Sequence, residues 1–131
     1  MSKSKINKSE AEWKNELSEA QYRILRKKGT EMPHSGVYNL HFEEGMYLCA
    51  GCSTPLFESQ SKFDAECGWP SFDASIKGNV EYILDKSHGM IRTEIVCSSC
   101  GGHLGHVFND GPTLTGTRYC VNSISIDFKK S

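Results

Sequence analysis

The sequence predicts a small, mainly β domain with a helical N-terminal arm and one metal site that holds the chain together. From Pro33 onward, short apolar or alternating runs are separated by Gly, Pro, Asn, Asp and Ser, which is the pattern of an all-β chain. Before Pro33 the sequence carries two helix-start signals. Two C-x-x-C pairs, at 49–52 and 97–100, supply four thiols at a spacing typical of zinc sites.

Two capping boxes predict the helices of the arm. Ser9 and Glu12 stand at the start of one short helix, and Ser18 and Gln21 repeat the same spacing at the start of a second. In such a pair each side chain accepts a hydrogen bond from the backbone N–H of the other residue. Two lysines and a glycine follow the second pattern and favour a helix end. We place the second helix at about 19–28.

The β region contains eight candidate strands. Each is a run of apolar or alternating residues bounded by turn-forming residues. They lie at 37–40, 46–50, 62–63, 80–84, 90–96, 106–108, 119–123 and 125–128. No internal repeat or linker interrupts the pattern, so we expect a flexible N-terminus at 1–8 and a single domain at 9–131.

The composition is that of an ordinary globular chain. Of its 131 residues, 37% are hydrophobic and 24% are charged, and the formal net charge is −1. These values argue against disorder and against a nucleic-acid-binding surface. No apolar run approaches the roughly 18 residues of a membrane span, and the N-terminus lacks the apolar segment of a signal peptide. We expect a cytoplasmic monomer that binds neither membranes nor nucleic acids, with its six cysteines reduced and serving as metal ligands or reactive groups.

Four of the cysteines form the predicted metal site. Cys49 and Cys52 follow one strand, and Cys97 and Cys100 follow another. Two thiolates of one tight turn can reach one ion, and two such turns complete the tetrahedron of four sulfurs that zinc favours. Because four protein ligands leave no open position, this Zn²⁺ is expected to be structural. The alternative is a pair of independent redox dithiols, or cysteines that are merely buried.

The two remaining cysteines are candidates for chemistry. Cys120 lies in a predicted strand, where alternation places Arg118, Cys120 and Asn122 on one face. A cation beside a thiol favours the thiolate, which makes Cys120 a candidate nucleophile. Cys67 lies in a loop rich in Gly and Pro and could serve as its resolving thiol. The alternatives are a plainly buried Cys120, an Arg118 engaged in a surface ion pair, and an incidental Cys67.

A glycine-rich segment adds polar and aromatic candidates. His103 and His106 stand three residues apart in "GGHLGHVFNDGP" and reach one pocket if the segment turns there. His103 could instead be a zinc ligand, although four cysteines are available for that task. Trp69 and Phe108 could line an apolar pocket, or could belong to the core. The remaining histidines are treated as surface or core residues: His34, His41 and His88.

The motifs "CGWPSF", "RTEIVCSSCGGHLGHVFNDGP" and "RYCVNS", in this order with the two C-x-x-C pairs, resemble those of the B-type methionine sulfoxide reductases. The resemblance extends from about Leu17 to about Phe128. It implies two antiparallel sheets with N-terminal helices and a zinc ion between the paired cysteines. It also implies reduction of the R epimer of methionine sulfoxide, mainly in oxidised proteins, with thioredoxin as the usual reductant.

The resemblance also assigns roles by position. Cys120 matches the nucleophile and Cys67 the resolving thiol, and the disulfide between them is recycled by thioredoxin. The residues that match those at the sulfoxide oxygen are His103, His106 and Asn122. Arg118 matches the arginine near the nucleophile. The methyl pocket is matched by Trp69 and Phe108. Two positions depart from the family pattern: Glu66 stands where a small residue is common, and His34 where an aromatic residue or glycine is common. Neither departure affects the nucleophile.

Two other functions remain open from the residues alone. A non-catalytic zinc module that binds a protein would keep the four-cysteine site, but it would not need Cys67 or Cys120. A thiol peroxidase or redox sensor would use the same two thiols on a different oxidant.

Overall fold

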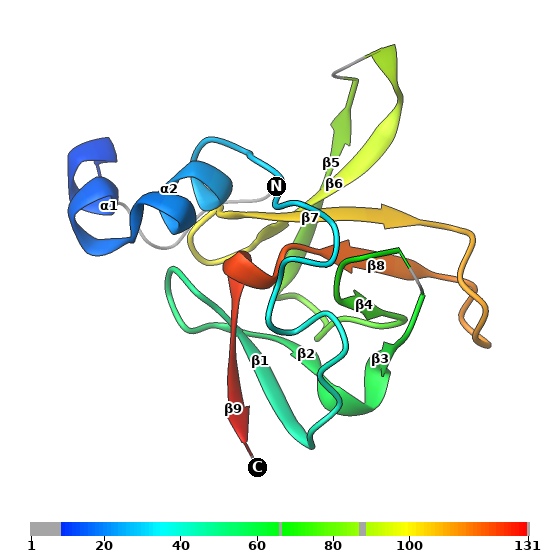
Figure 1. Cartoon of the computed structure of the whole chain (residues 1–131). Coiled ribbons are helices and arrows are strands. Elements are labelled where there is room, and N and C mark those ends of the chain that lie inside the picture. Colours follow the sequence, from blue (N-terminus) through cyan, green and yellow to red (C-terminus); the bar gives the residue numbers. More distant parts are fainter. Residues whose placement is uncertain (1–8, 66, 87–88, 131) are drawn as a thin grey trace.

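The helical arm begins the fold. The computed structural model describes residues 9–65, 67–86 and 89–130 (Figure 1). Helices α1 (Glu10–Glu16) and α2 (Glu19–Leu25) both start with a complete capping box, as predicted. Helix α2 is shorter than the predicted 19–28 because its C-cap is Arg26 and because Lys28 takes a left-handed backbone with φ 59°. The predicted flexible segment 1–8 lies outside the described residues.

Two antiparallel sheets follow the arm and confirm the predicted fold class (Figure 1). The smaller sheet has the order β2-β1-β9, formed by Pro55–Glu58, Gly45–Cys49 and Ile126–Lys130. The larger sheet has the order β3-β4-β8-β7-β6-β5. Its strands, in that order, are Lys62–Phe63, Ser71–Phe72, Arg118–Val121, His103–Phe108, Arg92–Cys97 and Val80–Asp85.

Several strand predictions differ from the structure. The predicted strand at 37–40 is wrong: this segment is a turn, and its apolar residues Val37 and Leu40 are 79% and 62% exposed. Strands β2 and β4 were not predicted, since a proline starts the first and the second has only two residues. The predicted strand 119–123 ends at Val121, because Ser123–Ser125 forms a 3₁₀ turn.

The core lies between the sheets and extends to the arm. Tyr47, Phe57 and Phe72 are fully buried at its centre, and the rings of Phe57 and Phe72 stack with centroids 4.3 Å apart. Trp13 of α1 and Leu25 of α2 belong to the same cluster. Helix α2 packs beside β7 and the 3₁₀ turn that follows β8. Among the described residues, no helix is long and apolar enough to cross a membrane.

Candidate functional site

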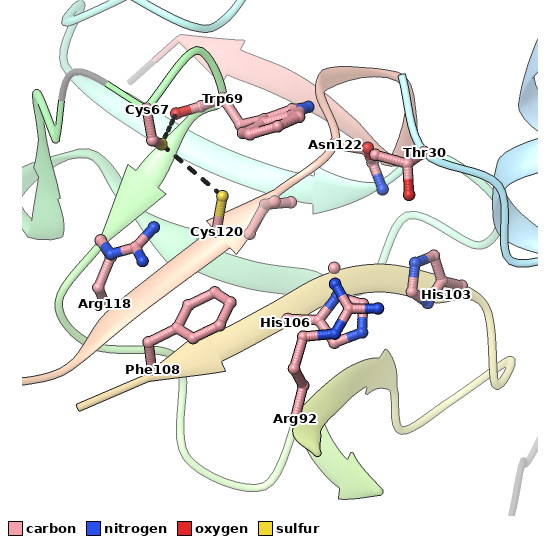
Figure 2. A pocket seen from close by; sticks show the side chains of 12 residues that line it. Thr30, Cys67, Trp69, Arg92, His103, His106, Phe108, Arg118, Cys120 and Asn122 are labelled. Carbon is pink, nitrogen blue, oxygen red and sulfur yellow. Dashed lines mark hydrogen bonds between the residues drawn. The ribbon is translucent and has the colours of Figure 1, made fainter. Parts of the chain in front are cut away.

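One pocket of about 280 Å³ opens on the large sheet (Figure 2). It gathers all eight side chains that the sequence proposed for chemistry or substrate binding, from β7, β8, the residue that follows β8 and the loop before β4. These are Cys67, Trp69, His103, His106, Phe108, Arg118, Cys120 and Asn122. The wall is completed by residues that the sequence did not suggest: Thr30, Arg92, Gly105 and Val121. The catalytic and binding roles of the eight remain predictions.

Strand β8 places Cys120 at the pocket. It lies between β4 and β7, with Cys120 opposite Ser71 on one side and His106 on the other. Burial alternates along β8 as predicted, since Arg118 and Cys120 are partly exposed and the residues between and after them are buried. Gly105 allows the close approach of β7, because a Cβ at this position would collide with the backbone carbonyl of Cys120.

The two non-cluster thiols lie side by side. The Sγ atoms of Cys67 and Cys120 are 3.7 Å apart (Figure 2). Cys67 also contacts the Trp69 carbonyl oxygen at 3.4 Å and the Ser71 hydroxyl at 3.3 Å. A disulfide needs an S–S distance of about 2.05 Å, so the two sulfurs must approach by only roughly 1.7 Å. Only a small movement of Cys67 is therefore needed to form the disulfide.

The contact between the two thiols shifts their pKa values in opposite directions. The hydrogen bond from the Cys120 thiol, opposed by burial and assisted by Ser71, the Trp69 backbone and Arg118, lowers the pKa of Cys67 to about 5. The same hydrogen bond, together with burial and the negative charge of Cys67, raises the pKa of Cys120. The prediction that Cys120 becomes the attacking thiolate stays a prediction, because these shifts describe the pair only while the two sulfurs are in contact. Attack by Cys120 thus requires its proton to leave or Cys67 to move aside.

The surroundings of Arg118 explain why this cation does not reverse the order of the pKa values of Cys67 and Cys120. Its Nε and Nη2 donate to the two carboxylate oxygens of Asp110 at 2.8 and 3.2 Å. Its guanidinium also lies 4.4 Å from the centre of the Phe108 ring. Because Asp110 partly neutralises this cation, Arg118 lowers the pKa of Cys120 by less than Cys67 raises it.

Alkylation of the reduced protein at pH 6 should therefore modify Cys67 before Cys120. The thiolate of Cys67 forms as pH rises through about 5, whereas an ordinary thiol with a pKa of about 8.5 is still protonated there. Peptide mass mapping after short exposure to iodoacetamide measures the order. In Cys67→Ser the neighbouring negative charge is lost, so the pKa of Cys120 should fall. Faster modification of Cys120 than of Cys67 in the wild type would contradict this account.

A β-bulge brings both histidines to the pocket. Val96 pairs with His103 and Ile95 pairs with Gly105, so Leu104 is an additional residue on β7. In a regular strand, residues three apart point to opposite faces, and the extra residue restores the same face. The rings of His103 and His106 lie 5.6 Å apart, and Leu104 enters the core. We expected a turn to bring both imidazoles to one pocket. In the structure a bulged strand does so.

Each histidine has a carboxylate partner that the sequence did not suggest. His103 Nδ1 lies 2.7 Å from Glu94 Oε2, and His106 Nε2 lies 2.7 Å from Asp85 Oδ2. Arg92 Nη2 also approaches Asp85, at 3.6 Å. Burial lowers the pKa of His106 more than Asp85 raises it, with Arg92 and His103 acting in the same direction as burial. The available signal for Glu94 was a charged residue that directly precedes the apolar run of "RTEIVC".

The residues just after α2 form another wall. Trp69 Nε1 donates to the Glu31 carbonyl oxygen at 3.0 Å, and the Glu31 backbone N–H donates to Asn122 Oδ1 at 3.0 Å. Asn122 Nδ2 donates to the Leu104 carbonyl oxygen at 3.2 Å. The indole N–H is thus occupied, and Asn122 keeps one amide hydrogen for a ligand. Nothing in the sequence pattern separated Thr30 and Glu31 from their neighbours.

The four remaining cysteines converge next to the arm. All four Sγ atoms of Cys49, Cys52, Cys97 and Cys100 lie within 4.8 Å of one another, and two pairs from different turns are 3.6 Å apart. A zinc tetrahedron with Zn–S bonds of about 2.3 Å has sulfurs roughly 3.8 Å apart. The backbone N–H groups of Gly51 and Gly102 each donate to a sulfur at 3.4 Å, which suits thiolate ligands. The residues present are positioned to bind a metal ion and fit zinc.

Histidine is not needed at this metal site. His103, considered from the sequence as an alternative ligand, is not among the residues whose ligand atoms cluster there, and its Nδ1 contacts Glu94. Of the other histidines, His41 bonds the Tyr47 hydroxyl at 2.8 Å, and His34 has a left-handed backbone with φ 66° whose N–H donates to the Gly68 carbonyl oxygen. The departure at Glu66 and the assignment of His88 lie outside the described residues.

Comparison with known proteins agrees with this site. The SelR domain model matches residues 17–130. Three relatives named peptide methionine sulfoxide reductase MsrB come from Leptospira interrogans, Variovorax paradoxus and Agrobacterium fabrum, and are 56%, 53% and 55% identical to the chain. Each match covers 95% of this chain, and covers 96%, 96% and 93% of the respective relative. The resemblance seen in the sequence motifs is confirmed, and the chain belongs to the SelR-domain family of MsrB-type proteins.

Proposed function

We propose that this chain is a peptide-methionine (R)-S-oxide reductase, which reduces the R epimer of methionine sulfoxide, chiefly in oxidised proteins, to methionine. The family membership supports methionine sulfoxide reduction. The observation that carries the proposal is the pair of thiols at 3.7 Å inside a pocket that also contains two histidines and two aromatic side chains. A binding module would have no use for this pair.

Cys120 is proposed to be the nucleophile. The sulfur of a sulfoxide is electrophilic, but its oxygen leaves only when it is protonated, so the site needs a thiolate and a proton donor. The Cys120 sulfur accepts the oxygen and becomes a sulfenic acid, while the sulfoxide sulfur gains two electrons and leaves as the thioether of methionine. The number of protons is unchanged, because the thiol loses one and the sulfenic hydroxyl gains one. His103 or His106 delivers the proton to the sulfoxide oxygen, and the amide hydrogen of Asn122 contacts the same oxygen.

Cys67 is proposed to complete the cycle. Its thiolate attacks the sulfenic sulfur, a Cys67–Cys120 disulfide forms, and the sulfenic hydroxyl takes up a proton from solvent and leaves as water. The 3.7 Å separation supports this step, because closure needs little movement. An external dithiol, which we propose to be thioredoxin in the cytoplasm, then reduces the disulfide and restores both thiols.

The pocket walls are proposed to select the methyl group. The faces of Trp69 and Phe108 border the space beside Cys120, and aromatic rings attract sulfur and its methyl group by roughly 0.3–1.5 kcal/mol. Arg118, which stacks on Phe108 and binds Asp110, fixes this part of the pocket.

The metal site is proposed to hold one structural Zn²⁺ per chain through Cys49, Cys52, Cys97 and Cys100. With four protein sulfurs, the ion cross-links the turn after β1 to the turn after β6, and it offers no position for substrate. Arg26 Nη1 donates to the Cys100 carbonyl oxygen at 2.8 Å, and β7 begins three residues after Cys100, so the cross-link supports the pocket without lining it.

An epimer assay tests the function. With thioredoxin, thioredoxin reductase and NADPH as the reducing system, the protein should reduce blocked L-methionine (R)-S-oxide and leave the S epimer unchanged, because one chiral pocket places the oxygen on one side. Product methionine is measured by chromatography. Turnover of neither epimer would favour a zinc-binding module, and turnover of hydrogen peroxide alone would favour a thiol peroxidase; either result would refute the proposal.

A further inference from the structure

Arg92 is a pocket residue whose hydrogen-bond donors are unused. It begins β6 and lines the pocket together with His106 (Figure 2). Its Nε is buried and has no hydrogen-bond partner among the residues that the structure describes. Its Nη2 lies 3.6 Å from Oδ2 of Asp85, which is an ion pair but is longer than a hydrogen bond. Because a guanidinium has several N–H donors and proteins rarely leave such groups unpaired, a partner is expected to come from outside the chain.

The other arginine at the pocket is already occupied. Arg118 donates two hydrogen bonds to Asp110 and lies over the ring of Phe108. Asp85 does not occupy Arg92 in the same way, because its Oδ2 lies closer to His106 Nε2, at 2.7 Å. Asp85 therefore keeps Arg92 near the pocket through its charge and leaves the N–H groups of Arg92 for a ligand.

Arg92 lies at the mouth of the pocket. It is opposite Asp85, and Glu94, two positions along β6, is opposite His106, so Arg92 shares the pocket face of the sheet. The exposed fraction of the side chain rises from 3% at His103 to 13% at His106 and 25% at Arg92. His103 is thus the deepest of these three side chains, and Arg92 is the nearest to solvent.

The shape of the proposed substrate determines which of its groups reaches the mouth. The sulfoxide must reach Cys120, while the polypeptide that carries it stays outside, because a pocket of about 280 Å³ holds a side chain and not a chain segment. Only a short stem of methylene groups separates the sulfur from the main chain, so the main chain must cross the mouth. It offers carbonyl oxygens as acceptors and N–H groups as donors. A guanidinium only donates, and can therefore bind only the carbonyl oxygens.

We propose that Arg92 is a substrate-binding residue that donates a hydrogen bond to a main-chain carbonyl oxygen of the polypeptide bound at the mouth. The inference rests on the proposed function and adds a contact with the main chain to those with the sulfoxide and its methyl group. A main-chain carbonyl is present at every position of every protein. The contact therefore holds the substrate without selecting a sequence, which suits a reductase that acts on many oxidised proteins.

Two substrates separate recognition of the main chain from recognition of the sulfoxide. N-acetyl-L-methionine (R)-S-oxide N-methylamide carries main-chain carbonyl groups, whereas (R)-ethyl methyl sulfoxide keeps only the side-chain atoms. Arg92→Met removes the donors and keeps an unbranched side chain. Its kcat/KM for the amide should fall roughly 10-fold, mainly through a higher KM, because a hydrogen bond from a charged group is lost. Its kcat/KM for ethyl methyl sulfoxide should remain that of the wild type.

A second variant and a control accompany this measurement. Arg92→Gln keeps a neutral amide donor and should show the same selective loss to a smaller extent, which provides the test if Arg92→Met does not fold. Arg23→Met replaces an exposed arginine of α2 and should change neither value. Equal losses for both substrates would show that Arg92 supports the pocket as a whole and would overturn the inference. Wild-type values for the amide in the folded Arg92 variants would also overturn it.

A binding experiment without turnover separates this inference from the proposed function. The reduced amide, N-acetyl-L-methionine N-methylamide, has the same main chain and is titrated into the protein while chemical shifts are followed by NMR. Its Kd should increase roughly 10-fold in Arg92→Met. An unchanged Kd, or no binding to the wild type, overturns the inference. If the wild type reduces neither epimer but binds this amide through Arg92, the proposed function fails and the Arg92 contact stands.

Discussion

Cys120→Ser is expected to lose methionine sulfoxide reduction, with a fall in kcat of more than about 10⁴-fold, because a serine hydroxyl at neutral pH cannot replace a thiol that must accept the oxygen. The pocket itself should remain, since the serine is nearly the same size and the neighbours Tyr119 and Val121 stay buried. Single-turnover release of methionine from the R sulfoxide is the direct measurement. Undiminished release would refute Cys120 as the nucleophile.

The control for this experiment is Cys67→Ser. It removes the second thiol of the 3.7 Å pair but leaves the nucleophile, so one equivalent of methionine should still be released per chain. Cycling with thioredoxin should fall sharply, because no disulfide can form. If cycling continued at the wild-type rate, Cys67 would not be the resolving thiol. Dimedone should trap a sulfenic acid on Cys120 in this variant.

Removal of the metal is expected to unfold the domain. Structural zinc contributes roughly 10–16 kcal/mol of apparent binding free energy in small zinc-finger peptides, whereas a whole domain is stable by only about 5–15 kcal/mol. Cys97, fully buried at the end of β6, is the ligand to test. In Cys97→Ser, zinc content measured by atomic absorption should fall from one per chain toward zero. The circular dichroism spectrum should lose its cooperative thermal transition.

The matched control is again Cys67→Ser, a cysteine substitution outside the cluster of four. It should retain one zinc per chain and a cooperative transition. A strong chelator should have the same effect on the wild type as Cys97→Ser has. A wild-type melting temperature in Cys97→Ser, or after complete removal of metal, would show that the cysteine cluster does not stabilise the fold.

The sequence predicted the fold where local signals determine structure. Both capping boxes formed, since a capping box needs only neighbouring residues. The strand prediction at 37–40 was wrong because a run of apolar residues forms a strand only when a partner strand exists. Here Val37 and Leu40 are exposed in a turn. Strand β4 consists of only two residues and is a strand solely because β3 and β8 lie on either side of it. No local pattern could have shown that.

The site was predictable in its residues and less so in its electrostatics. Unusual residue types at family spacings pointed to Cys67, Cys120 and the two histidines, and the pocket contains them all. Which thiol carries the charge depends on a 3.7 Å contact between residues 53 positions apart, and the sequence has no signal for such a distance. Glu94 was missed for a related reason, because its contact with His103 depends on a bulge on the neighbouring strand.

The hydrogen bond between Glu31 and Asn122 spans 91 positions of the chain, which has a consequence for biosynthesis. On the ribosome, the segment carrying Glu31 emerges long before Asn122, so this wall of the pocket cannot close until Asn122 has been translated. Such distant contacts also form slowly. During that interval the nascent polypeptide carries Cys67 without its neighbouring thiol, because Cys120 is translated 53 positions later.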